Sequence, residues 1–145
     1  MHVLDGSVVI PNMALKQSLD SAGSFMNLKI RGKGQQTWTK TLKTGMLIPN
    51  PLILGIDPKT VRGEWIMANS NGKRGSGTRV KRCFPLMDQW ETTASILIFN
   101  DAITEDIFTR CLETSGKYIG LGRFRPENGG TFGRFEILKV DWKKS

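Results

Sequence analysis

Apolar residues recur at helical spacing directly after Pro11. Asn12 has a side chain suited to an N-cap, and Gly23 is placed to end a helix. The residues between them that share one face of such a helix are Ala14, Leu15, Ser18, Leu19 and Ala22. The pattern therefore predicts a first amphipathic helix that begins near Asn12.

A second helical pattern follows Thr104. The Thr104 hydroxyl suits an N-cap, and Glu105 and Asp106 in the first turn favour the positive end of the helix dipole. Gly116 is expected to stop this helix. Its expected buried stripe consists of Ile107, Phe108, Cys111 and Leu112.

Five segments rich in apolar and β-branched residues are expected to be strands. They span 2–10, 27–31, 93–99, 118–124 and 132–142. Together with the two helices, their order predicts an α+β fold with a ferredoxin-like (RRM-like) arrangement, in which both helices cover one face of an antiparallel sheet. The 145 residues correspond in length to one domain that can bury a core.

Glycine and proline residues divide the segment 32–85 into short pieces, so this segment is expected to be an irregular insertion. Short strands are expected at 52–55 and 65–68. The stretch 69–82 combines small polar residues with five basic ones and is expected to be a mobile loop that orders on a partner.

The charged residues indicate which kind of partner this protein binds. Lys and Arg number 21 against 13 Asp and Glu, which gives a formal net charge of +8. Residues 29–43, called here the basic segment, carry five basic residues and no acid, whereas 88–113 is mainly acidic. Such segregation favours nucleic acid, an anionic membrane surface or an acidic protein as partner.

The segment 118–135, called here the glycine-rich loop, combines five glycines with three arginines and three phenylalanines. Glycines allow backbone N–H groups to approach phosphates, arginines supply charged forks, and phenylalanines can stack on bases. The alternative is an ordinary β-hairpin with Phe132 and Phe135 in the core.

Metal and membrane sites have little support in the sequence. Cys83 and Cys111 lie far apart in no metal-ligand spacing, and His2 is the only histidine, so no metal and no other cofactor is expected. The start of the chain does not resemble a signal sequence, and no apolar run is long enough for a membrane span. The expected location is the cytoplasm, which is the host cytoplasm if the chain is phage-encoded.

Two motifs support a family resemblance. The sequence Val9-Ile10-Pro11-Asn12-Met13-Ala14-Leu15-Lys16-Gln17-Ser18-Leu19 resembles the entry to the first helix in the RAMP superfamily. The later stretches Ile119-Gly120-Leu121-Gly122-Arg123 and Gly129-Gly130-Thr131-Phe132-Gly133-Arg134-Phe135 resemble the terminal glycine-rich loop of that superfamily. That superfamily contains RNA-binding subunits of CRISPR effector complexes. The resemblance implies an RRM-like fold, RNA binding and alignment of copies along a strand. The short length of 145 residues and Asn12, where the superfamily typically has Gly, suit a minimal, stand-alone or phage-borne relative.

Catalysis has weaker support than binding. Some members of the RAMP superfamily cut RNA, and metal-independent cleavage needs a general acid and base, usually with a histidine. His2 is the only histidine, and Tyr118 with Lys117 would be an improvised replacement. No catalytic residue is therefore assigned, and a metal-independent endoribonuclease stays as an alternative.

The sequence thus predicts a non-catalytic protein that binds single-stranded nucleic acid, with RNA favoured over DNA, and that forms homo-oligomers along the strand. The other alternative is a phage factor that docks on a host protein or complex through its basic surface. Trp38, in a polar environment, suits base stacking, subunit contact or burial. The predicted nucleic-acid-binding residues are Arg31, Lys33, Trp38, Lys73, Arg74, Arg79, Lys81, Arg82, Gly120, Gly122, Arg123, Arg125, Gly129, Gly130, Gly133 and Arg134.

Overall fold

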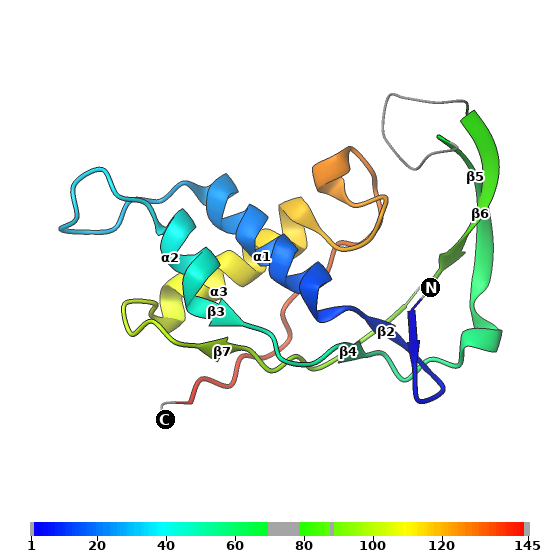
Figure 1. The fold of residues 1–145 in the computed structure, drawn as a ribbon, viewed down its shortest axis with the longest axis horizontal. Helices are drawn as coiled ribbons and strands as arrows, with labels where there is room; N and C mark the ends of the chain where they lie inside the picture. Colours follow the sequence, from blue (N-terminus) through cyan, green and yellow to red (C-terminus); the bar gives the residue numbers. More distant parts are fainter. Residues whose placement is uncertain (1, 70–78, 88, 144–145) are drawn as a thin grey trace. The chain divides into compact units, whose positions relative to one another are not determined.

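The computed structural model describes residues 2–69, 79–87 and 89–143 (Figure 1). The chain divides into two compact units. Unit 1 consists of Met1–Ile10 and Leu52–Thr93, and unit 2 consists of Pro11–Pro51 and Ala94–Ser145. Each unit is therefore built from two separate stretches of the sequence.

Unit 1 begins with a β-hairpin. Strands β1 (His2–Leu4) and β2 (Ser7–Ile10) pair antiparallel, and β2 also pairs with β4 (Leu52–Ile53). Asp5 and Gly6 between the strands both have positive φ, 49° and 76°. An Asp-Gly pair of this kind favours a type I′ turn, so the segment 2–10 is a hairpin and not the single strand expected from its apolar residues.

A second hairpin completes unit 1. Strand β5 (Arg62–Asn69) pairs antiparallel with β6 (Arg79–Leu86), so the strand expected at 65–68 is confirmed as part of β5. A short 3₁₀ helix (Pro58–Thr60) precedes it, capped by the Asp57 carboxylate, which accepts a hydrogen bond from Lys59 N at 3.0 Å. The basic residues at 79–82 were expected in a mobile loop and instead lie in β6. Residues 70–78 lie outside the described part of the chain.

Unit 2 is built around three α-helices, α1 (Asn12–Met26), α2 (Trp38–Gly45) and α3 (Glu105–Thr114). Both predicted helices are confirmed, whereas α2 lies in the segment expected to be irregular. Its only buried apolar side chains are Trp38 and Leu42, and one such pair is too short a pattern to indicate a helix by itself. The core of unit 2 includes Leu15, Leu19, Ala22, Leu42, Ile48, Phe108, Cys111 and Ile119.

The ends of α1 differ from expectation. Pro11 occupies the N-cap position, and the Asn12 side chain donates a hydrogen bond to the Ile48 carbonyl at 2.9 Å instead of capping the helix. Gly23 lies inside the helix, where an added Cβ would meet the Leu42 side chain at 3.3 Å. The helix continues to Met26, and Asn27 ends it in the left-handed conformation. Gly23 thus serves the packing of α1 against α2.

Helix α3 begins as predicted and ends differently. Thr104 Oγ1 accepts a hydrogen bond from Ile107 N, which confirms the predicted cap. After Thr114 the chain widens into a π-helical turn (Ser115–Ile119) that ends at Gly120. Gly116 does not stop the helix. A Cβ there would lie 2.2 Å from the Phe135 carbonyl oxygen, so the contact with the C-terminal stretch explains this glycine.

Most of the predicted ferredoxin-like sheet is absent from the described residues. Residues 27–31 contribute one isolated bridge, Lys29 with Thr37, and 93–99 contributes only β7 (Leu97–Ile98), which pairs with β3 (Met46–Leu47). Residues 118–124 and 132–142 were expected to be strands and contain none. The mixed α and β class with antiparallel pairing is confirmed, although the structure has three α-helices where two were expected, and the two strands at the C-terminal end are a wrong prediction.

Candidate nucleic-acid interface

The glycine-rich loop folds back on itself. Leu121 N donates to the Gly133 carbonyl at 2.9 Å, and Phe132 N donates to the Phe124 carbonyl at 3.0 Å, with a short 3₁₀ helix (Pro126–Asn128) between these contacts. The loop therefore has the partial pairing of a hairpin without regular strands.

Two of its glycines are required by backbone contacts inside the loop. A Cβ at Gly130 would lie 1.9 Å from the Phe124 carbonyl oxygen, and one at Gly133 would lie 1.8 Å from the Leu121 carbonyl oxygen. Gly120 is buried, whereas Gly122 and Gly129 are exposed. Close packing of the loop on itself thus accounts for glycines that were predicted to admit a ligand.

The arginines of the loop differ in their surroundings. Arg125 donates to the Glu127 carboxylate at 2.9 and 3.1 Å and to the Gly122 carbonyl at 3.0 Å. Arg134 is exposed, and its Nε donates to the Lys117 carbonyl at 3.1 Å. Arg123 is exposed as well. The charge of Arg125 is therefore largely compensated within the loop, while the hydrogen bond of Arg134 is to a neutral carbonyl and leaves its charge uncompensated by it.

A buried polar contact fixes the start of the loop to α1. The hydroxyl groups of Ser18 and Ser115 lie 2.6 Å apart, and Ser18 Oγ donates to the Gly120 carbonyl at 2.9 Å. Phe132 is exposed and Phe135 is half-buried, so the alternative in which both rings form the core is wrong for Phe132. The loop is held by backbone hydrogen bonds and by the serine contacts, and Phe132 adds an exposed ring to it.

The basic segment presents a different arrangement. It connects α1 to α2 and continues along α2, and all five of its basic side chains are exposed. None of the five forms an ion pair with another residue in the described ranges. The sequence from 21 to 56 contains no acidic residue. These five side chains are Lys29, Arg31, Lys33, Lys40 and Lys43.

Trp38 is the buried aromatic residue of the basic segment. It is the first residue of α2 and is 8% exposed, in the core of unit 2. A ring buried to this degree has little face left for a base, so the stacking role considered for Trp38 is replaced by burial. The residues that were predicted with it, Arg31 and Lys33, remain exposed.

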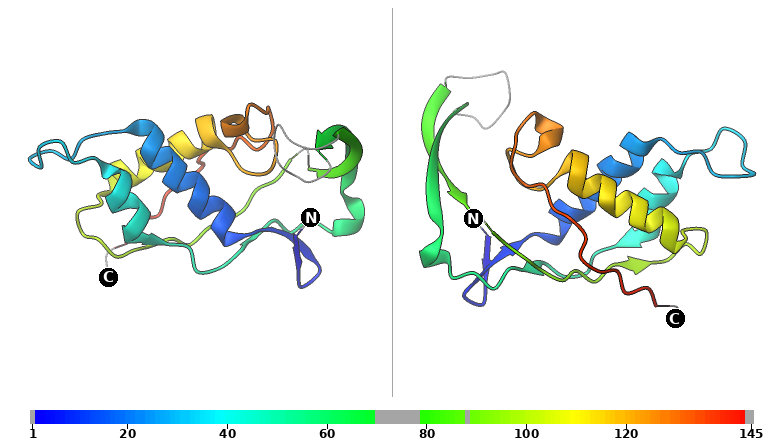
Figure 2. Two further views of the ribbon diagram at one scale, coloured as in Figure 1. Left: turned by 45° about the horizontal axis from the view of Figure 1, so that its top comes forward. Right: turned by 180° about the vertical axis from the view of Figure 1, so that it is seen from behind.

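The predicted binding residues fall into separate groups. The views in Figures 1 and 2 show the loop after α1 and the glycine-rich loop toward opposite ends of unit 2, with α1 between them. Arg79, Lys81 and Arg82 belong to β6 of unit 1, where Arg82 pairs with Ile66 and Lys81 with Met67 in the strand register. Lys73 and Arg74 lie outside the described residues. In unit 2, Arg31 and Lys33 therefore form one group in the loop between α1 and α2. The arginines of the glycine-rich loop form a second group, which consists of Arg123, Arg125 and Arg134.

Acidic residues gather on α3 as the charge pattern indicates. Glu105, Asp106 and Glu113 are exposed, and Asp106 forms an ion pair with Arg110 at 3.3 Å. Within unit 2, acidic α3 and the acid-free basic segment are therefore distinct surfaces.

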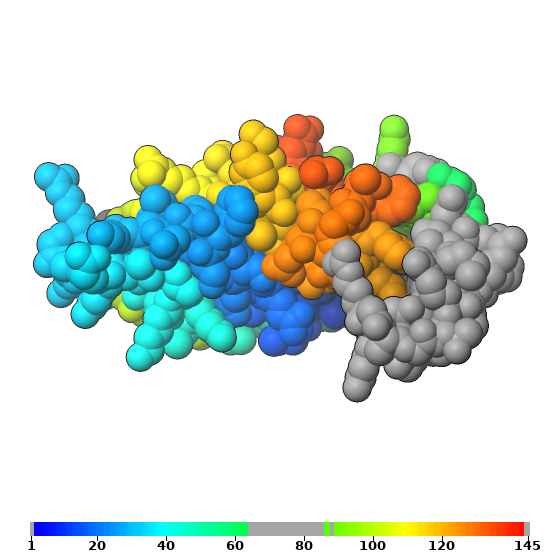
Figure 3. Space-filling model, turned by 90° about the horizontal axis from the view of Figure 1, so that it is seen from above, coloured from blue at the N-terminus to red at the C-terminus, as the bar shows by residue number. Residues whose placement is uncertain are grey.

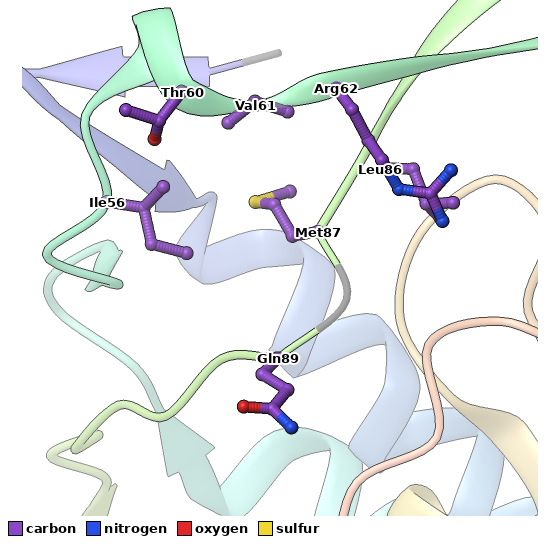
Figure 4. Close-up of a pocket in the computed structure, with 7 residues that line it drawn as sticks. All are labelled: Ile56, Thr60, Val61, Arg62, Leu86, Met87 and Gln89. Carbon is purple, nitrogen blue, oxygen red and sulfur yellow. The ribbon is translucent and has the colours of Figure 1, made fainter.

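Three further features concern the chemistry of the described residues, namely a hollow in unit 1, the Cys111 thiol and His2. Unit 1 has a hollow of about 290 Å³, and Thr60, Arg62 and Gln89 are its polar lining residues (Figure 4). Burial raises the pKa of the Cys111 thiol to about 12, with the nearby Asp20 adding to the effect, so this thiol is protonated at neutral pH. His2 is exposed in β1.

Two further findings concern metals and membranes. No cluster of three or more metal-ligating side chains occurs among the described residues. None of the helices in the described ranges combines the length and the hydropathy that a membrane span requires.

Comparison with known proteins adds no relative: no family model, no curated protein and no solved structure matches this chain. The resemblance to the RAMP superfamily accordingly depends on the two short motifs alone. Of these, the first lies at β2 and the start of α1, and the second lies in the glycine-rich loop.

Proposed function

We propose that this protein is a non-catalytic binder of single-stranded nucleic acid, with RNA favoured over DNA. The observation that carries this proposal is the basic segment, whose five exposed cations have no acidic residue within the surrounding 36 positions, 21–56. A phosphate backbone is the ligand whose charge best matches such a surface, because each contact releases counterions.

The placement of the cations supports binding along a strand. Arg31 and Lys33 lie in the loop between α1 and α2, and Lys40 and Lys43 lie on α2 itself. Charges spread along a loop and a helix face suit successive phosphates of an extended chain. The motifs that resemble the RAMP superfamily favour RNA as the nucleic acid, and they favour homo-oligomers that assemble along it.

Salt dependence tests this proposal directly. Substitution of Arg31, Lys33 and Lys40 by alanine removes up to three phosphate contacts, and each contributes roughly 0.7 to the slope of log affinity against log salt for a single strand. The slope for a labelled single-stranded RNA should therefore flatten by about 2. Because the three side chains are exposed, stability should change by only about 0.5 kcal/mol.

The matched control is a second triple alanine variant, which also loses three positive charges, at positions scattered over the chain. Lys59, Arg110 and Lys139 are exposed and lie outside the basic segment, so their joint substitution by alanine should leave the salt slope close to that of the unaltered protein. Equal effects of the two triple variants would indicate binding by net charge alone. Purification free of nucleic acid, together with no salt-sensitive binding of RNA or DNA, would overturn the proposal in favour of a protein partner.

A further inference from the structure

Two aromatic rings stack on the surface of unit 2. Phe25, near the end of α1, and Tyr118, in the π-helical turn after α3, have ring centroids 5.2 Å apart and an interplanar angle of 23°. Their exposed fractions are 59% and 47%. Most aromatic side chains of this size are largely buried, and a stacked pair that stays this exposed provides an apolar, planar surface to a ligand.

Two positively charged side chains, Lys117 and Arg134, lie beside this aromatic pair. Lys117 Nζ lies 5.3 Å from the centroid of the Tyr118 ring, within cation–π distance. The Lys117 carbonyl accepts the hydrogen bond from Arg134 Nε, which places a second exposed cation beside the same turn. An aromatic surface edged by Lys and Arg complements a base and its phosphate.

The aromatic pair also lies between the two groups of predicted binding residues. Phe25 comes shortly before the basic segment in the chain, and Tyr118 is the first residue of the glycine-rich loop. Figure 3 shows α1 adjoining the glycine-rich loop on one face, with the loop after α1 at the far end of the same unit. The aromatic pair joins the C-terminal part of α1, which leads into the basic segment, to the start of the glycine-rich loop.

The backbone around Tyr118 explains how its ring comes to the surface. The π-helical turn Ser115–Ile119 places Ser115 and Ile119 in the interior and leaves Lys117 and Tyr118 exposed. The Ser18, Ser115 and Gly120 contacts hold this turn against α1, which also carries Phe25. Rigid support of this kind suits a preformed stacking surface, and π-helical turns are frequent at functional sites.

We propose that the Phe25 and Tyr118 rings stack on a base of the bound single strand, with Lys117 and Arg134 next to the adjoining phosphates. This inference rests on the proposed function and adds the element that recognises bases to the cations that recognise the backbone. Neither aromatic residue stands out in the sequence as a binding residue, because the two lie far apart in the chain and meet only in the folded unit.

The experiment compares labelled oligouridine with an abasic strand of equal length and charge. Joint substitution Phe25→Ala and Tyr118→Ala should weaken oligouridine binding about 5- to 150-fold, the range expected for loss of one to a few stacking contacts. Binding of the abasic strand and the salt slope for oligouridine should stay unchanged, because no phosphate contact is removed. Phe99→Ala, at an exposed phenylalanine elsewhere in unit 2, is the matched control and should bind as the unaltered protein does.

Two single variants separate stacking from folding. Tyr118→Phe keeps the ring and should retain the affinity for oligouridine, whereas Tyr118→Leu keeps apolar volume without a ring face and should lose it. Equal loss on oligouridine and on the abasic strand would assign the pair a structural role and overturn the proposal. Unchanged affinity of the double variant for oligouridine would overturn it too, whatever its mass in gel filtration. Failure of the unaltered protein to bind either strand would instead overturn the proposed function.

Discussion

The glycine-rich loop and the basic segment are both rich in arginine or lysine, yet the structure gives their polar groups different partners. In the loop, Arg125 is paired with Glu127, and Gly130 is required by the Phe124 carbonyl. In the basic segment, Arg31 and Lys33 are exposed and have no ion pair among the described residues. Composition suggested a ligand site in both regions. The structure distinguishes them, because Arg125 and Gly130 have their partners inside the loop, whereas the cations of the basic segment are exposed and have no ion pair among the described residues.

Replacement of Trp38 by alanine tests whether the basic segment depends on a buried anchor. Removal of a buried tryptophan side chain should lower the free energy of unfolding by about 3–5 kcal/mol, measured by urea denaturation. Lys40→Ala, two residues further along α2 and exposed, should change it by only about 0.5 kcal/mol. A Trp38→Ala protein of normal stability that has lost nucleic-acid binding would restore the stacking role.

Substitution at Gly130 tests whether the glycines of the loop serve its own packing. An alanine Cβ would overlap the Phe124 carbonyl oxygen, so Gly130→Ala should lower the free energy of unfolding by about 3 kcal/mol. Gly122→Ala is the matched control, because its Cβ meets open space and only its φ of 91° is unfavourable, which should cost about 1 kcal/mol. Equal and small losses at both positions would show that the loop is free to rearrange.

The arginines of the loop provide the smallest expected effect. Joint substitution of Arg123, Arg125 and Arg134 by alanine should flatten the salt slope for single-stranded RNA by about 0.7, the value of one phosphate contact. Compensation of Arg125 by Glu127 is the reason for expecting fewer than three contacts, whereas Arg134 is the arginine that lies beside Lys117 and Tyr118. A flattening of about 2, equal to that expected for the basic segment, would make the loop an equal part of the interface.

Local patterns were enough to predict several elements of this protein. Helical spacing identified α1 and α3, the Thr104 cap was correct, and β5 was recognised from the apolar residues at 65–68. These features depend on residues within one or two turns of each other. The Asp5-Gly6 turn also had a local signal, since Asp-Gly favours a type I′ hairpin, although the segment was interpreted as one strand.

The sequence by itself determined the two long helices, the mixed α and β class and the basic segment, because spacing, capping and charge are local properties. Only the tertiary structure decided the burial of Trp38, the internal use of Gly130 and Arg125, and the meeting of Phe25 with Tyr118. Each of these depends on contacts with atoms that the local pattern does not specify. The strands expected at 118–124 and 132–142 failed for the same reason. Residues 118–135 form a loop fixed by contacts with Ser18 and Gly116, and further along the chain Trp142 contacts Phe108 of α3 rather than joining a sheet.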